Sequence, residues 1–154
     1  MQNQEYIKLA IGQAKKSFGL GGFPAGAIVV KDGEIIGEGV STGLTVNDPV
    51  EHGEINAIKK ACLKLNTPWI KGATLYSSME PCLMCLGACG WANVQDIYFA
   101  CKKDTVDSNS YLGKYSNVEI LNSFDKKINF NYIDVGFEDE LKDMIKVWEK
   151  NTFG

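Results

Sequence analysis

The chain has 154 residues and a formal net charge of -3, and 45% of its residues are hydrophobic while 23% are charged. This length and composition suit one globular unit, so we expect residues 1–154 to form a single domain. The acidic balance argues against a nucleic-acid partner, and no apolar run reaches the roughly 20 residues of a membrane span. The polar residues after Met1 show no secretory signal, so we expect a cytoplasmic protein.

The first part of the chain predicts one helix followed by a β-hairpin. Apolar residues recur at three- and four-residue steps over residues 5–18, which is typical of an amphipathic helix that covers a sheet. Short apolar runs at 25–30 and 34–38 flank Asp32 and Gly33, a pair that favours a tight turn between antiparallel strands. Residues 39–50 then read as a polar, glycine-containing loop.

The rest of the chain alternates strands with helices. The pattern predicts helices at 51–65, 81–91 and 137–150, and strands at 74–78, 97–100, 118–121 and 130–133. Residues 101–117 are polar and rich in turn-forming residues. This order predicts an α/β protein, a three-layer α/β/α sandwich around a mixed sheet.

Three potential metal ligands stand at the starts of two predicted helices. His52 is the only histidine of the chain, and Cys82 and Cys85 are separated by two residues. Zinc is bound by imidazole nitrogen and thiolate sulfur, and a catalytic zinc keeps three protein ligands and one open position. We therefore predict one Zn²⁺ per chain, held by His52, Cys82 and Cys85.

A carboxylate accompanies these ligands. Glu54 follows His52 by two residues, and an acid beside a metal-activated water is what proton transfer requires. A structural zinc would instead need a fourth protein ligand, and Cys89, four residues after Cys85, is expected to be a core thiol. A thioredoxin-type redox pair is a competing interpretation of the two cysteines, but it leaves the His-x-Glu pattern unexplained.

His-x-Glu followed by Pro-Cys-x-x-Cys resembles the pattern of the cytidine and deoxycytidylate deaminase superfamily. Further segments are similar to small bacterial guanine deaminases, namely Asn47 to Pro49, Glu80 to Cys82, Met84 to Ala88, and Trp91 with Ala92. Gly21 to Gly26 and the glycine between His52 and Glu54 resemble cytosine deaminases of fungi. The resemblance implies a five-stranded sheet between helices, a small-molecule base as substrate, and a homodimer.

The same resemblance implies hydrolytic removal of an exocyclic amine, and guanine deamination to xanthine and ammonia is the reaction we favour. Cytosine deamination, tRNA adenosine deamination and a zinc-stabilised interaction domain without activity stay open. The acidic residues of the last predicted helix argue against tRNA. Ser41 stands where these families place an asparagine that binds the base. The candidate substrate-binding residues are Ser41, Gly53, Trp91 and Trp148, and weaker candidates for an amine-binding acid are Asp104, Asp107 and Asp134.

Overall fold

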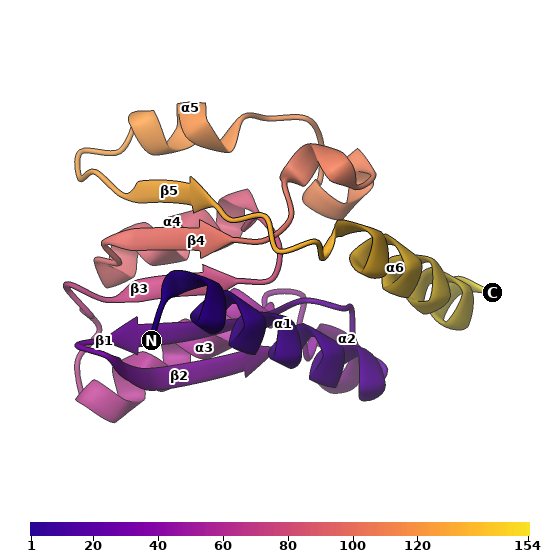
Figure 1. Ribbon diagram of the computed structural model, residues 1–154, viewed down its shortest axis with the longest axis horizontal. Helices are drawn as coiled ribbons and strands as arrows, with labels where there is room; N and C mark the ends of the chain where they lie inside the picture. The colour runs from indigo at the N-terminus through magenta and orange to yellow at the C-terminus, as the bar shows by residue number, and fades with distance from the viewer.

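One mixed sheet of five strands organises the chain, and the computed structural model describes all 154 residues. The strand order is β2-β1-β3-β4-β5 (Figure 1). β1 (Gly26–Lys31) pairs antiparallel with β2 (Glu34–Val40) and with β3 (Thr74–Ser77). β4 (Asp96–Phe99) and β5 (Asn129–Tyr132) continue the sheet parallel to β3. The predicted mixed sheet is confirmed.

The β1–β2 hairpin has the turn that its sequence predicts. Lys31 pairs with Glu34, so only Asp32 and Gly33 lie in the loop. Their φ angles are 51° and 77°, and two successive positive φ values mark the turn whose twist matches a hairpin. Asparagine and aspartate tolerate this conformation better than other non-glycine residues, which explains why Asp-Gly specifies the turn.

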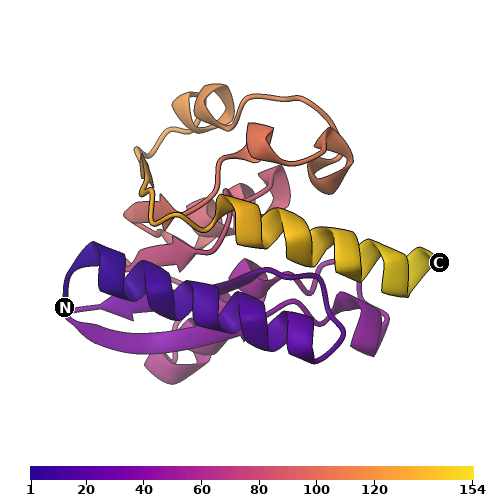
Figure 2. The same cartoon turned by 45° about the vertical axis from the view of Figure 1, so that its right-hand side comes forward.

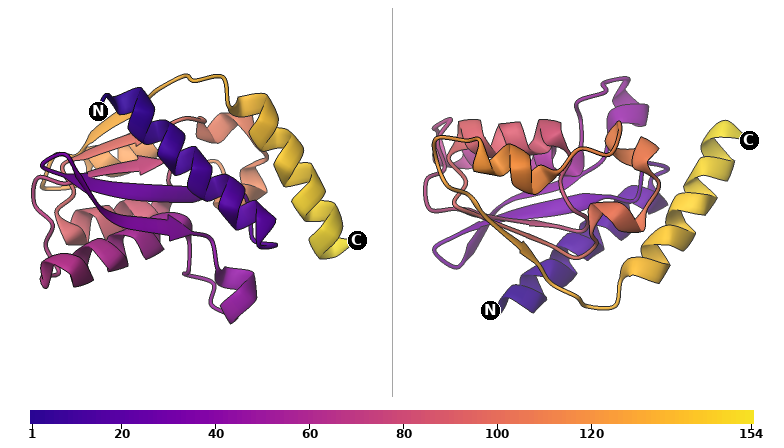
Figure 3. Two further views of the ribbon diagram at one scale, coloured as in Figure 1. Left: turned by 60° about the horizontal axis from the view of Figure 1, so that its bottom comes forward. Right: turned by 90° about the horizontal axis from the view of Figure 1, so that it is seen from above.

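Helices cover both faces of the sheet, as the predicted three-layer sandwich requires (Figure 3). α3 (Gly53–Leu65), α4 (Leu83–Ala92) and α5 (Asn117–Asn122) pack on one face. α1 (Asn3–Gly19) and the start of α6 (Glu138–Phe153) pack on the other. Figure 2 shows α1 and α6 side by side, and an ion pair of 3.1 Å joins Lys15 Nζ to Glu140 Oε1 between them.

Each face of the sheet has its own buried core. Side chains alternate along a strand, so Ala27 and Val29 of β1 face α3 and α4, while Ile28 and Val30 face α1. Shorter elements connect the layers: α2 (Gly43–Val46) and two 3-10 turns, η1 (Lys103–Thr105) and η2 (Ser108–Tyr111). No helix is both long and apolar enough to cross a membrane.

One predicted strand is wrong, because residues 118–121 belong to helix α5. Ser116 caps this helix, and its Oγ accepts a hydrogen bond of 3.2 Å from the Glu119 backbone N–H. Serine followed three residues later by glutamate is a helix-start pattern that outweighs the short apolar run. Several helix boundaries also differ by two or three residues: α1 begins at Asn3 rather than at residue 5, α3 at Gly53 rather than at residue 51, and α4 at Leu83 rather than at Pro81, while α6 extends to Phe153.

Candidate active site

The loop before α3 is tied to that helix, and this fixes His52. His52 is the N-cap residue of α3. The Asn56 side chain of α3 donates to the Val40 carbonyl at 2.8 Å and to Thr42 Oγ1 at 3.1 Å. The Thr42 backbone N–H donates to the Glu51 carbonyl at 3.0 Å. The end of β2 and the residues just before His52 are therefore held against one helix.

Gly53 lets the start of α3 approach the sheet closely. A Cβ atom at this position would lie 2.9 Å from Gly26 Cα and 3.2 Å from the Ala25 carbonyl oxygen. Gly53 also lines the cavity described below. Close packing against Ala25 and Gly26 therefore favours glycine at position 53. The predicted contact with substrate would be a second role of this residue.

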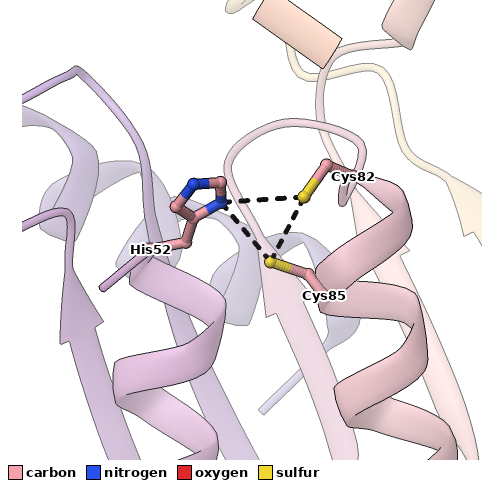
Figure 4. Close-up of side chains that lie close together, drawn as sticks. All are labelled: His52, Cys82 and Cys85. Carbon is pink, nitrogen blue, oxygen red and sulfur yellow. Dashed lines mark hydrogen bonds between the residues drawn. The ribbon is translucent and has the colours of Figure 1, made fainter. Parts of the chain in front are cut away.

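α4 brings the two cysteines to His52, as Figure 4 shows. Cys82 is the N-cap residue of α4, and Cys85 lies in its first turn. His52 Nδ1 is 3.6 Å from Cys82 Sγ and 3.7 Å from Cys85 Sγ, and the two sulfur atoms are 3.7 Å apart. The structure therefore brings the three predicted ligands together, all within 4.8 Å of one another.

These distances fit a tetrahedral zinc ion. With Zn–S of about 2.3 Å and Zn–N of about 2.0 Å, tetrahedral angles place two sulfurs about 3.8 Å apart and sulfur about 3.5 Å from nitrogen. The observed spacings lie within about 0.2 Å of those values. A thiol pair and an imidazole are also the ligand types that zinc prefers. Cys89 is fully buried and is not part of this group, in agreement with its predicted place in the core.

The protonation of the three ligands is coupled. Hydrogen bonding with Cys85 lowers the pKa of Cys82 to about 4, and the His52 imidazole acts in the same direction. The hydrogen bond with Cys82 in turn raises the pKa of His52. Hydrogen bonding to Cys82 and burial raise the pKa of Cys85. Cys82 therefore has the lower pKa of the two thiols, because Cys85 and His52 both stabilise its thiolate form.

Glu54 lies beside the ligands with its side chain out of the solvent. Only 5% of the residue is exposed, and it lines the same cavity as His52 and Cys82. Burial raises the pKa of the Glu54 carboxyl, and this outweighs the lowering by the neighbouring Cys85 thiol. A carboxyl with a raised pKa is suited to accept and release a proton near neutral pH.

A cavity of about 830 Å³ opens over these residues. Its walls come from separate parts of the chain: the loop after β2, the 3-10 turn η2 and the end of α6. Two predicted substrate contacts, Ser41 and Trp148, line it together with Gly53. The cavity is also lined by residues that were not predicted to contact substrate, Phe23, Leu44, Asn109, Ser110, Tyr111 and Glu149.

Trp148 is the centre of an aromatic wall. Its ring meets Phe23 edge to face with centroids 5.0 Å apart, and Phe153 in the same way at 5.6 Å. Its indole Nε1–H is buried and has no hydrogen-bond partner in the protein. A buried donor without a partner is costly, and Trp148 itself lines the cavity.

Trp91 is not brought to this cavity. It lies at the end of α4 with 85% of its surface exposed, and it does not line the cavity. Trp91 follows Cys85 by six residues along α4. It therefore lies near the opposite end of this helix from the two cysteine ligands. The three candidate acids Asp104, Asp107 and Asp134 also lie outside the cavity, and the acid of α6 that lines it is Glu149.

Comparison with known proteins gives one family. Residues 1–101 match the model of the cytidine and deoxycytidylate deaminase zinc-binding region. The guanine deaminase of Bacillus subtilis is 43% identical over 101 residues, 65% of this chain and 65% of that protein. The tRNA-specific adenosine deaminase of Aquifex aeolicus is 39% identical over 100 residues, 65% of this chain and 66% of that protein. The alignments thus span slightly less than two thirds of each relative.

A solved structure extends the similarity to the C-terminal part. The X-ray structure of the guanine deaminase from Bacillus subtilis superposes with a TM-score of 0.66 and 32% identity. The superposition covers 97% of this chain and 95% of that chain.

Proposed function

Because the chain belongs to the cytidine and deoxycytidylate deaminase zinc-binding family, we propose that it is a hydrolytic deaminase of a free nucleobase or a related aminated heterocycle. Guanine is the substrate that we favour, and guanine and water would give xanthine and ammonia. The observation that carries this proposal is the buried Glu54 carboxyl in one cavity with ligand atoms spaced for zinc.

His52 Nδ1 and the sulfur atoms of Cys82 and Cys85 would hold the metal. Zinc with three protein ligands retains one open position and lowers the pKa of a water there to about 7. The protein would contribute a cavity whose apolar and aromatic walls exclude other water from the reacting atoms.

Glu54 is the residue that we assign to proton transfer. Its carboxylate would take a proton from the attacking water while the water oxygen bonds to the carbon that carries the amine. It would deliver that proton to the neighbouring ring nitrogen. It would then move the remaining hydroxyl proton to the amine, so that the C–N bond breaks and ammonia leaves. Glu54 ends the cycle as it began.

Three features of α6 support a small substrate. Trp148 and Phe153 place aromatic rings at the cavity, where a flat heterocycle can pack against them. The helix carries an acidic first turn, Glu138, Asp139 and Glu140, which disfavours phosphate backbones. Glu149 adds a carboxylate at the cavity wall that can accept N–H groups of an aminated ring.

The second candidate is deamination of adenosine in tRNA. It is favoured by the 39% identity to a tRNA-specific adenosine deaminase, close to the identity with a guanine deaminase. Both activities would use His52, Cys82, Cys85 and Glu54 in the same roles. They differ in what must reach the cavity, a free base or a nucleotide in a folded RNA.

We further propose that residues 1–154 work as one domain within a homodimer. α4 contains no charged residue, and Leu83 and Trp91 expose apolar surface on it. A second copy of the chain covering this face would bury Trp91. The dimer predicts that Trp91→Glu yields monomers in solution, as measured by light scattering.

The five free cysteines favour the reducing cytoplasm as the location of the protein.

The test of the function is ammonia release from a panel of amines by protein of measured zinc content. The panel contains guanine, cytosine, adenosine, cytidine, aminated pterins and triazines, and a tRNA anticodon stem-loop. We expect guanine to give the highest kcat/KM. Turnover of the stem-loop alone would replace guanine with the second candidate. Zinc-loaded protein that releases ammonia from none of these compounds would contradict the proposal.

A further inference from the structure

We infer that Glu80 and Asn117 are positioning residues for the metal site, because they fix the turn that carries Cys82. The inference rests on the proposed zinc site. It concerns the segment 78–82, which lies between β3 and α4 and belongs to neither element. Its backbone has no regular strand or helix pairing, so its place is set by what it bonds to elsewhere.

The Glu80 carboxylate bonds across to the segment 103–117. One oxygen, Oε1, accepts the Lys103 backbone N–H at 2.9 Å. The other, Oε2, accepts a hydrogen of the Asn117 Nδ2 amide at 2.6 Å. Both partners come from the polar stretch that contains η1 and η2 and leads into α5. A single acidic side chain thus fastens the 103–117 segment at both of its ends.

Asn117 bonds to the same turn a second time. Its Nδ2 also donates to the Pro81 carbonyl oxygen at 2.8 Å. A side-chain amide has two N–H groups, and here both are directed to the two residues that precede Cys82. Only 2% of Asn117 is exposed, so water does not compete for these hydrogen bonds.

Further contacts of the segment bracket Cys82 on both sides. The Tyr111 hydroxyl donates to the Glu80 carbonyl oxygen at 2.5 Å. The Leu83 backbone N–H donates to the Tyr115 hydroxyl at 3.0 Å. Residues 80, 81 and 83 are each held by this segment, so the backbone of Cys82 has little freedom to move. The position of its sulfur relative to His52 and Cys85 follows from that restraint.

The segment also forms part of the cavity wall through Asn109, Ser110 and Tyr111. The same stretch of chain therefore contacts the space for the substrate and holds a metal ligand. Residues that orient metal ligands typically change metal affinity about 10- to 100-fold when they are replaced. A purely structural role would instead lower folding stability and leave the affinity of the folded protein for zinc unchanged.

The variant Asn117→Asp tests this, since it keeps the shape of the side chain, removes both N–H donors and sets a carboxylate against Glu80. The matched control is Asn129→Asp. Asn129 Nδ2 donates to Asp96 Oδ1 at 2.7 Å, the same kind of bond, but at the first residues of β4 and β5 and away from the metal ligands. Glu80→Gln and Tyr115→Phe are milder variants that decide the question if Asn117→Asp does not fold.

Zinc affinity is measured by competition with a chelator, and the ligand geometry by the visible absorption of Co²⁺ bound in place of zinc. We expect Asn117→Asp to weaken zinc binding about 10- to 100-fold and to change the Co²⁺ spectrum, with smaller changes of the same direction in Glu80→Gln and Tyr115→Phe. Asn129→Asp is expected to keep the wild-type values. Wild-type affinity and spectrum in Asn117→Asp and Glu80→Gln, or an equal loss in Asn129→Asp, would overturn the inference. A wild-type protein that binds zinc without releasing ammonia would refute the proposed function alone.

Discussion

His52 and Cys82 occupy the same position in two different helices, since each is an N-cap residue, and their ligand atoms lie 3.6 Å apart. Two helix starts therefore meet at one point. The positive end of a helix stabilises a nearby thiolate, and the short spacing gives the metal two ligands on rigid elements. The structure thus brings together the two helix starts at which the ligands were predicted.

Replacement of Cys85 tests whether the three ligand atoms act together. Cys85→Ala removes a fully buried sulfur that lies 3.7 Å from both other ligand atoms. We expect the purified variant to retain less than about a tenth of the zinc of the wild type, because two ligands hold zinc poorly. The control is Cys62→Ala, which changes a cysteine outside the ligand group. Equal zinc in both variants would remove Cys85 from the site.

Trp148→Phe tests whether the buried indole N–H of this cavity-lining residue contributes to substrate binding. The phenyl ring can keep the edge-to-face contacts with Phe23 and Phe153, so the change removes chiefly the unpartnered donor. One hydrogen bond contributes about 0.5–1.5 kcal/mol, so we expect kcat/KM to fall about 2- to 10-fold. The exposed Trp69 provides the control variant Trp69→Phe. If steady-state kinetics show no difference between the two variants, the indole N–H does not bind substrate.

Gly39→Ala tests the close packing that places α3. A Cβ at Gly39 would lie 2.1 Å from the Gly53 carbonyl oxygen and 2.5 Å from the Ala57 nitrogen. We expect a loss of about 1–3 kcal/mol in the free energy of unfolding, because α3 would have to move from β2. Gly12→Ala is the contrasting change within α1, where nothing lies within 4 Å of the new atom. It should stabilise by about 0.5–1 kcal/mol. Thermal denaturation that ranks the two variants in the opposite order would contradict this packing.

The metal ligands could be predicted from sequence because their motif is local. His52 and Cys82 are 30 residues apart, yet each stands at a helix start that its own neighbours specify. The hairpin was predictable for the same reason, since Asp32 and Gly33 determine one turn. Helix α5 differs from the predicted strand because the capping signal of Ser116 and Glu119 outweighs the short apolar run at 118–121.

The cavity wall was harder to predict, because it depends on long-range packing. Trp148 and Glu149 are adjacent in α6, and both line the cavity in a helix that continues beyond the ends of the strands (Figure 1) and lies beside α1 (Figure 2). Trp91 was expected to contact substrate, but it is exposed and does not line the cavity. Sequence spacing along one helix does not specify which distant loops will face it.

The role of Glu54 is measured most directly by ammonia release from wild-type protein and Glu54→Gln, each loaded with zinc to the same measured content. Glu34→Gln is the control, because Glu34 is exposed and pairs with Lys64 on the surface. An amide cannot carry the proton, and general acid–base catalysis contributes typically about 10²- to 10⁴-fold. We predict that Glu54→Gln keeps its zinc while its kcat falls at least about 10²-fold. Glu34→Gln should keep wild-type turnover. Wild-type ammonia release by zinc-loaded Glu54→Gln would contradict the account.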